Sequence, residues 1–245
     1  MYDSPRFLGL GEGCLIVEFS DRVEMEANVR LQELRRALSG KMLRGLIECA
    51  PAYRSLSIHH DPLTLARGRL EEIVRAELDR FGDVSSDVGR SLVLPVAYGG
   101  EFGPDMRSVS EHTGLDEEEI ISRHTARECY CYMLGFTPGF GYLGGMDESL
   151  ATPRLESPRT LILAGSVGIA GVQTGAYSVD GPGGWRLIGR TPLRLFDPED
   201  GEKPTLLDAG DRVRFRRISE MEYDTIKRDV TAHRYVPERG GEGRG

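Results

Sequence analysis

The pattern of apolar residues over the first 89 positions predicts a small domain of strands and two helices. Residues 8–19 and 45–60 have the alternating or continuous apolar character of strands, with turns at their glycine and proline residues. Between them, apolar residues recur at helical spacing from about 23 to 38. A second helix is expected to open at Asp61-Pro62, a cap followed by a first-turn proline, and to end at Gly82. This order predicts an α+β domain over residues 1–89 in which both helices cover one sheet face.

The rest of the chain is dominated by short strand patterns. A small, polar segment at residues 82–90 is typical of a linker, and a new apolar run follows it. Two short helices are expected at about 105–112 and 117–125, the second capped by Asp116. Strands are expected at 91–98, 128–134, 191–196 and 211–218. Many short strands with glycine turns predict an all-β, closed or nearly closed barrel over residues 90–220, followed by a tail at 221–245 that ends in GGEGRG.

The stretch from Gly135 to Arg190 is the most distinctive part of the barrel sequence. Its glycine and proline content is too high for a helix, so short strands joined by tight turns are expected. Charged residues are sparse in it, and aromatic residues stand at its turns. This combination favours the wall of a groove over a solvated loop.

Composition and charge exclude several classes of protein. The formal net charge of -8 over 245 residues argues against a general polyanion binder, so we expect no nucleic-acid partner. The two short helices resemble a helix-turn-helix, but the acidic run Glu117 to Glu119 would be repelled by DNA phosphates. No run of 18 apolar residues and no signal peptide are present, which predicts a cytoplasmic protein without a membrane span. The four cysteines lack metal-site spacing and are expected to be reduced and structural.

Candidate chemistry rests first on arginines in the charge-poor stretch. Arg154, Arg159 and Arg190 could bind a carboxylate or phosphate through their forked donors, or each could hold a turn through backbone carbonyls. The pairs Gly165-Ser166 and Gly183-Gly184 could expose backbone N–H groups as an anion nest. The sequence contains no Walker motif, and Ser166 lacks the elbow of a serine hydrolase. The sequence contains no histidine or carboxylate cluster that would predict a metal site.

Further polar and aromatic residues are candidates for lining the groove, each with a structural alternative. Gln173 and Tyr177 could contact a ligand or be satisfied core or surface groups. Pro138 and Gly139 are further candidates for substrate or anion binding. The aromatic residues could form a ligand platform, although large aromatics dominate cores and interfaces as well; they are Phe136, Phe140, Tyr142 and Trp185. His124, at the end of a predicted helix, could be a general base or a packing group.

Several ordered motifs resemble one protein family. They are GFTPGFGYLGG, which includes Pro138 and Gly139, the paired Pro-Arg motifs at 153–154 and 158–159, AGSVGIAG, QTGAY and GPGGWRLIGRTP. Together with YGGEFGPDM and the N-terminal CLIVEFSD, they resemble the family that comprises the B-type subunit of 5-oxoprolinase, allophanate hydrolase subunit 1 and the sporulation-kinase (Kip) inhibitor, of carboxyltransferase subdomain C and D type. His124 matches a histidine of the family. The sequence departs from the family at two places. Leu163 stands where the family usually has proline, and in the motif AYSVDGPGGW Ser178 and Gly181 stand where proline and serine are usual.

The resemblance implies a fold, partners and an activity. It implies an N-terminal α/β domain, a cyclophilin-like barrel, a companion barrel subunit of the C type of 5-oxoprolinase and a third subunit of the A type. The implied activity is ATP-dependent cleavage of 5-oxoproline to glutamate, with ATP and Mg used by the assembled complex and no cofactor predicted for the isolated chain. Within that activity, we take His124, which matches a histidine of the family, and the two arginines Arg154 and Arg159 as catalytic candidates. The alternatives are an inhibitor of a sensor histidine kinase and a subunit of an allophanate or urea amidolyase-type hydrolase.

Overall fold

The computed structural model of the protein describes residues 1–81 and 89–239. The chain divides into two compact units, residues 1–88 and residues 89–245. Most of the predicted linker and the final GGEGRG lie outside the described residues. Each unit is described by itself below.

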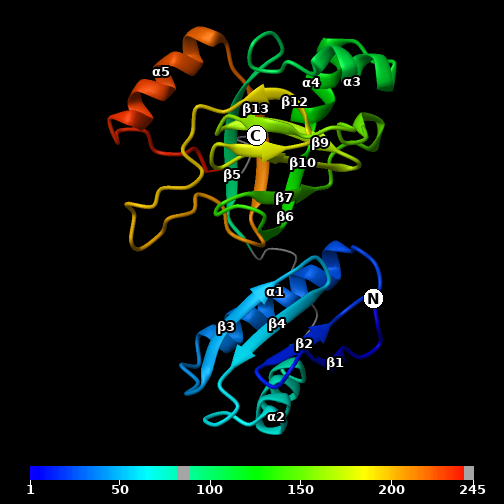
Figure 1. Ribbon diagram of the computed structural model, residues 1–245, viewed down its shortest axis with the longest axis vertical. Coiled ribbons are helices and arrows are strands. Elements are labelled where there is room, and N and C mark those ends of the chain that lie inside the picture. Colours follow the sequence, from blue (N-terminus) through cyan, green and yellow to red (C-terminus); the bar gives the residue numbers. More distant parts are fainter. Residues whose placement is uncertain (82–88, 240–245) are drawn as a thin grey trace, which may run out of the picture. The chain divides into compact units, whose positions relative to one another are not determined.

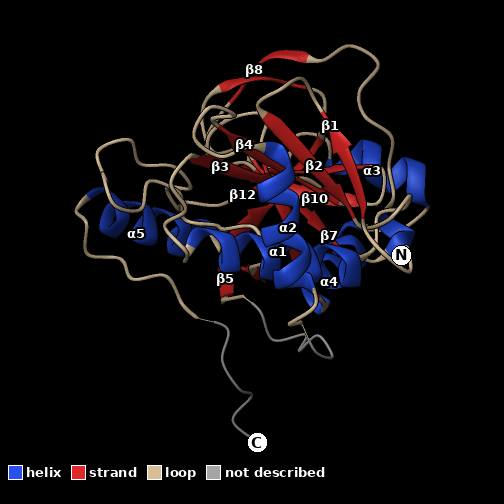
Figure 2. Cartoon of the chain, turned by 90° about the horizontal axis from the view of Figure 1, so that it is seen from below, coloured by secondary structure: helices blue, strands red, loops and turns tan. Residues whose placement is uncertain are grey.

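The first unit is a four-stranded antiparallel sheet with two helices (Figure 1). Its strands, in the sheet order β1-β2-β4-β3, are β1 (Arg6–Gly9), β2 (Cys14–Glu18), β4 (Ser55–His60) and β3 (Leu46–Pro51). The helices are α1 (Met25–Ser39) and α2 (Arg67–Leu78), which lie side by side in Figure 2. Leu15, Leu34, Leu56 and Leu70 belong to one buried core. Because these residues come from both helices and from β2 and β4, the two helices pack on one face of the sheet.

The predicted start of the second helix is wrong. Asp61 caps a turn instead, where its carboxylate accepts hydrogen bonds from the Leu63 N–H at 3.0 Å and from the Thr64 hydroxyl at 2.5 Å. The helix begins later, at Arg67. A cap followed by proline is as typical of a turn as of a helix, and the local hydrogen bonds of Asp61 favour the turn.

The second unit is built on a closed seven-stranded barrel, in the order β10-β7-β6-β13-β5-β12-β9. Its strands are β5 (Ser91–Tyr98), β6 (Glu128–Leu134), β7 (Gly141–Gly144), β9 (Ser166–Ala170), β10 (Gln173–Ala176), β12 (Arg186–Arg190) and β13 (Arg212–Arg217). Strands β5 and β13 run parallel, and the other pairs of the barrel run antiparallel. Because the barrel is closed, each of its strands is hydrogen-bonded to a neighbour on both sides and no sheet edge is left open.

Helices cover the barrel (Figure 1), and a small second sheet belongs to the same unit. Helices α3 (Met106–Thr113) and α4 (Glu117–Ala126) pack on it through Val109 and Ile120, and Asp116 caps α4 as predicted. After the short 3-10 helix η1 (Glu148–Leu150), strand β8 (Arg159–Ile162) pairs with β11 (Gly181–Gly183) in a two-stranded sheet of its own. We call this pair the β8–β11 flap.

Two predictions for the end of the chain need correction. Residues 191–196 form no strand, although Leu193 and Leu195 are buried; a single bridge joins Phe196 to Thr205. The segment expected as a tail contains helix α5 (Glu220–Thr231), which packs on the barrel core through Tyr223 and Ile226.

One buried side chain of the first unit gives a test of its packing. Asn28 on α1 is fully buried, and its amide donates 2.9 Å hydrogen bonds to the carbonyls of Ala52 and Tyr53 in the turn between β3 and β4. Asn28→Ala would leave these carbonyls without this donor, so we expect a loss of about 1–3 kcal/mol in the free energy of unfolding. Urea unfolding followed by circular dichroism measures it, with the exposed neighbour Glu26→Gln as control. Equal midpoints for both variants would contradict this role of Asn28.

Candidate functional site

A cavity of about 230 Å³ lies between barrel strands and the β8–β11 flap. We call it the aromatic pocket. Its lining comes from the β6–β7 turn, β7, the segment between η1 and β8, β11 and the residues that flank β10 and β12. The lining residues are Phe136, Phe140, Tyr142, Arg154, Pro158, Tyr177, Pro182, Gly183, Gly184 and Trp185. All of them belong to the stretch that the sequence marks as a groove wall.

Phe140 is the centre of the aromatic wall. The residue is 1% exposed, and its ring meets those of Tyr142, Tyr177 and Trp185 at centroid distances of 5.0, 5.3 and 5.3 Å. All three contacts are edge-to-face, the arrangement that the ring quadrupoles favour. Each ring therefore fixes the orientation of the next, and the wall is pre-formed.

Tyr177 and Gly183 shape the polar end of the pocket. The Tyr177 hydroxyl oxygen accepts a hydrogen bond from the Trp185 backbone N–H, and burial raises the pKa of this phenol, so the hydroxyl is neutral at pH 7. A Cβ atom on Gly183 would overlap that hydroxyl oxygen. Glycine at this position therefore keeps the space beside the hydroxyl open.

Phe136 forms the outer lip of the pocket in an unfavourable backbone conformation. Its φ of 68° lies in the left-handed region, and 62% of the residue is exposed. Such a conformation costs on the order of 1–3 kcal/mol for a bulky residue and persists only where the surroundings impose it. The surroundings here are a tight turn, in which Thr137 N–H donates to the Gly135 carbonyl at 2.8 Å and the Thr137 and Ser178 hydroxyls share a 3.2 Å hydrogen bond.

Arg154 supplies the positive charge of the pocket. Its guanidinium carbon lies 5.9 Å from the centroid of the Trp185 ring. Within residues 1–81 and 89–239, it forms no hydrogen bond or ion pair, and it is the only charged residue that lines the pocket. A free guanidinium beside an aromatic wall favours a small ligand with one carboxylate and an apolar body.

The other two predicted arginines are engaged elsewhere. Arg159 donates to both carboxylate oxygens of Asp105, at 2.9 and 2.7 Å. Arg190 is half-buried on β12, and its side chain interacts with the Tyr223 hydroxyl of α5. Neither lines the aromatic pocket, so the structure brings one of the three guanidinium groups to it.

The first predicted anion nest does not form. Gly165 N–H donates to the Tyr177 carbonyl at 2.7 Å, and Ser166 N–H donates to the Leu163 carbonyl at 3.1 Å. Because both donors are engaged, this pair offers no N–H group to an anion. Neither Gly165 nor Ser166 lines the pocket. Three other predicted residues also lie outside its lining, namely Gln173 on β10, and Pro138 and Gly139 in the β6–β7 turn.

His124 lies in the barrel core, away from the aromatic pocket. Its Nδ1 is 2.8 Å from the Tyr98 hydroxyl, and its Nε2 is 2.8 Å from Thr174 Oγ1. Since the Thr174 hydroxyl donates to the Gly168 carbonyl at 3.1 Å, its oxygen accepts from Nε2–H, and Nδ1 accepts from Tyr98. Burial lowers the pKa of His124 to about 3, so the ring is a neutral packing and hydrogen-bonding group at pH 7.

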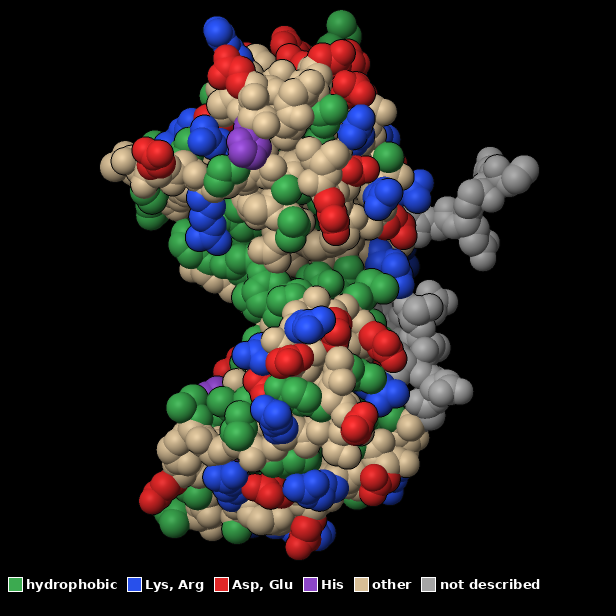
Figure 3. Space-filling model, turned by 90° about the vertical axis from the view of Figure 1, so that its right-hand side faces the viewer, with side chains coloured by type: hydrophobic (Ala, Val, Ile, Leu, Met, Phe, Trp, Pro, Cys, Tyr) green, Lys and Arg blue, Asp and Glu red, His purple; other side chains and the backbone are tan. Residues whose placement is uncertain are grey.

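Among the residues that the structure describes, the cysteines form neither a disulfide nor a metal site. All four cysteines are free thiols, and burial raises the pKa of Cys129 to about 12 and that of Cys49 to about 11. In the part of the chain that the structure describes, no group of three His, Cys, Asp or Glu residues could hold a metal ion, and no helix is long and apolar enough to cross a bilayer. On the face drawn in Figure 3, cationic and anionic side chains are interspersed.

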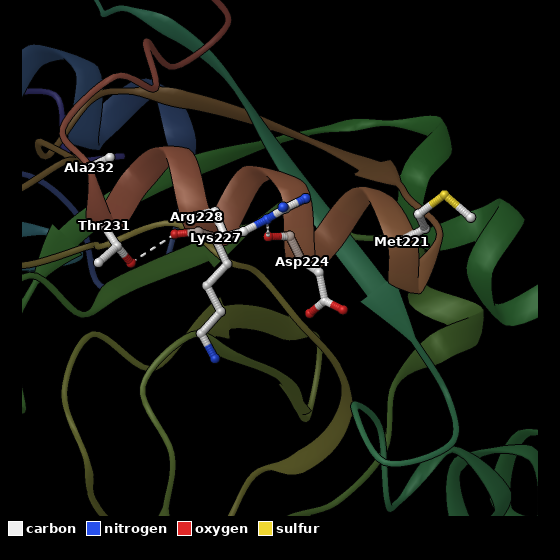
Figure 4. A pocket seen from close by; sticks show the side chains of 6 residues that line it. All are labelled: Met221, Asp224, Lys227, Arg228, Thr231 and Ala232. Atoms are coloured by element: carbon white, nitrogen blue, oxygen red, sulfur yellow. Dashed lines mark hydrogen bonds between the residues drawn. The ribbon is translucent and has the colours of Figure 1, made fainter.

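A wider depression of about 860 Å³ lies on the outer face of α5 (Figure 4). The described residues that line it all come from this one helix and its C-terminal end, and include Met221, Lys227 and Arg228. Arg228 Nε donates to the Asp224 carbonyl and its Nη2 to the Thr225 hydroxyl. A single exposed helix face encloses no ligand, so the aromatic pocket is the better candidate site despite its smaller volume.

Comparison with known proteins shows one matching family and several similar proteins and structures. The family described as carboxyltransferase domain, subdomain C and D, matches residues 5–207. The B-type subunit of 5-oxoprolinase from Bacillus subtilis (strain 168) is 42% identical over 230 residues, which cover 90% of this chain and 95% of that protein. Among solved structures, TTHA0988 is 36% identical with a TM-score of 0.75 over 84% of this chain, which spans 40% of that protein. The urea carboxylase of Kluyveromyces lactis shares the fold at 18% identity and a TM-score of 0.74, over 96% of this chain and 24% of that chain.

The neutral state of His124 predicts a specific pH dependence of stability. The unfolded histidine protonates near its ordinary pKa of 6.5, whereas the folded one stays neutral down to about 3. Stability from this group is therefore present above pH 6.5 and is lost as the pH falls toward 3, by on the order of 1 kcal/mol per pH unit. His124→Gln removes this dependence, so urea unfolding between pH 4.5 and 6.5 should show a shallower slope for the variant. Parallel slopes would contradict a neutral, buried His124.

Proposed function

Because the chain belongs to the carboxyltransferase domain, subdomain C and D family, we propose that it is the B-type subunit of an ATP-dependent 5-oxoprolinase. The observation that carries this proposal is the 42% identity to a 5-oxoprolinase subunit of this type over 95% of that protein's length. The aromatic pocket, with its single free guanidinium, supports it independently. We assign 5-oxoproline to this pocket.

The pocket matches the chemistry of 5-oxoproline group by group. The carboxylate of the substrate pairs with the Arg154 guanidinium, which is free to form two parallel hydrogen bonds. The apolar ring edge packs against Trp185 and Phe140. The Tyr177 hydroxyl donates to the lactam oxygen beside the space that Gly183 leaves open.

The pocket does not fit a magnesium nucleotide. A triphosphate needs several cations or backbone donors. Among the described residues that line the pocket, one arginine is the only charged one, and the sequence has no Walker motif. In such an enzyme ATP activates the stable lactam amide. We therefore place the binding of ATP and Mg on companion subunits, of the C and A types, and restrict this chain to holding and orienting the substrate.

The chain's other candidate catalytic groups are consistent with a role limited to substrate binding. Both ring nitrogens of His124 are occupied by protein partners, and the Arg159 guanidinium is bound to both carboxylate oxygens of Asp105. Neither can reach a ligand in the aromatic pocket as the structure stands. We accordingly propose no nucleophile or general base on this chain.

The alternative functions have weaker support. The resemblance to urea carboxylase is one of fold, at 18% identity, whereas the identity to the B-type subunit of 5-oxoprolinase is more than twice as high. An assembled complex that cleaves allophanate and leaves 5-oxoproline intact would favour an allophanate hydrolase. A complex that cleaves neither, together with inhibition of a histidine kinase by this chain, would favour the regulatory role.

Arg154 is the residue through which we test the substrate assignment. In the complex reconstituted with its companion subunits, Arg154→Gln should raise the KM for 5-oxoproline by about ten- to a hundredfold, because a charge-assisted pair worth about 1.5–3 kcal/mol is lost. Glutamate release measures it. The control is Arg194→Gln, an exposed arginine that pairs with Asp197 at 2.7 Å and does not line the pocket. An unchanged KM in the Arg154 variant would remove this pocket as the carboxylate site.

A further inference from the structure

A buried carboxylate at the start of α3 joins three elements of the second unit. Asp105 is 7% exposed and accepts the paired hydrogen bonds of Arg159 from the β8–β11 flap. Its Oδ2 also accepts from the Leu187 N–H of β12 at 2.7 Å, and its own N–H donates to the Leu187 carbonyl at 2.9 Å. The flap and β12 are thus tied to the same helix end.

A second arginine extends this network. Arg186 on β12 donates from Nη1 to the Ser108 hydroxyl on the first turn of α3 at 3.2 Å. Its Nε donates to the Pro153 carbonyl at 3.3 Å. The segment between η1 and β8 is therefore also connected to α3. We call the four side chains Asp105, Ser108, Arg159 and Arg186 the α3 clasp.

Each segment that the clasp holds carries a lining residue of the aromatic pocket directly beside the anchored position. Pro153, whose carbonyl accepts from Arg186, precedes Arg154. Arg159 follows Pro158, and Arg186 follows Trp185. The members of the clasp themselves do not line the pocket.

We propose that the α3 clasp is a positioning network that sets the geometry of the aromatic pocket from outside it. Asp105, Arg159 and Arg186 anchor the backbone beside three lining residues of the pocket. They thereby fix the positions of Arg154, Pro158 and Trp185 relative to one another. The inference rests on the proposed function in that it takes the aromatic pocket as the 5-oxoproline site. Its members are positioning residues, since none of them touches the substrate.

The chemistry of the clasp suits this role. A planar guanidinium bound through two parallel hydrogen bonds fixes both the distance and the angle of the flap, which a lysine ammonium cannot do. A displacement of about 1 Å in a substrate-binding group can lower activity by about a hundredfold. The clasp is thus placed to control affinity for the substrate without taking part in the reaction.

Trp185 is the only tryptophan of the chain, so its fluorescence reports on the pocket wall directly. Asp105→Asn keeps an acceptor for the Leu187 N–H and removes the ion pair with Arg159. We expect faster quenching of Trp185 by acrylamide in the isolated variant, and in the reconstituted complex a KM for 5-oxoproline raised by about tenfold with kcat within about twofold. Arg159→Lys should behave in the same way because it keeps the charge and loses the paired geometry.

The matched control is Arg107→Gln on the same helix, whose guanidinium pairs with Glu111 in solvent. It should leave quenching and KM unchanged. Normal quenching and KM in both Asp105→Asn and Arg159→Lys would overturn the proposal, as would a loss confined to kcat.

Two further outcomes separate the possible causes of failure. If Asp105→Asn and Arg159→Lys do not fold, Ser108→Ala is the deciding variant, because it removes one hydrogen bond of Arg186. Increased acrylamide quenching of Trp185 in this variant supports the clasp, and unchanged quenching overturns it. If quenching rises as expected but the wild-type complex does not cleave 5-oxoproline, the clasp stands as a device that shapes the pocket and the proposed function fails.

Discussion

The site depends on one contact, the packing of the Phe140 and Trp185 rings against the backbone of Gly175. A Cβ atom on Gly175 of β10 would come 3.1 Å from the Trp185 ring, 3.2 Å from the Phe140 ring and 2.9 Å from the Gly141 carbonyl oxygen. Glycine there lets both rings lie directly on the barrel wall, where edge-to-face contacts lock their orientation. A rigid aromatic surface follows from this single close approach, and the pocket is built on that surface.

The rest of the second unit supports that surface from two sides. The neutral His124, bonded to Tyr98 and Thr174, holds β10 from within the barrel. The α3 clasp holds the flap and β12 from outside. Polar groups buried in this way are costly unless they are satisfied, and the hydrogen bonds of His124 and Asp105 make both arrangements stable. Neither arrangement engages Arg154, the residue to which we assign substrate binding.

Local patterns in the sequence predict much of this architecture, because strands, caps and glycine turns depend on near neighbours. Asp116 caps α4 as expected, and the aromatic lining falls within one continuous stretch. The strand prediction at residues 191–196 is wrong because the alternating leucines there are buried without a strand ladder beside them. Helix α5 lies in the predicted tail, although Ser219, whose hydroxyl accepts from the Glu222 N–H, provides a capping signal that the sequence contains.

The different positions of the predicted arginines, inside and outside the pocket, could not be predicted from the sequence. Arg154 and Arg159 stand in similar Pro-Arg pairs, yet one faces the pocket and the other binds Asp105, 54 residues earlier. A sequence gives no measure of which carboxylate a distant strand approaches, and so Asp105 and Ser108 carry no functional signal in it. The buried position of His124 likewise depends on barrel closure, which brings β5, β10 and α4 together around it.

The central claim is that the aromatic pocket binds a small carboxylate ligand through Arg154. Titration of the isolated chain with 5-oxoproline, followed by Trp185 fluorescence, tests it most directly because the only tryptophan is part of the pocket wall. The account predicts a saturable change in emission that is weakened in Arg154→Gln. A response that is absent at concentrations saturating the assembled enzyme, or that is identical in the variant, would contradict it.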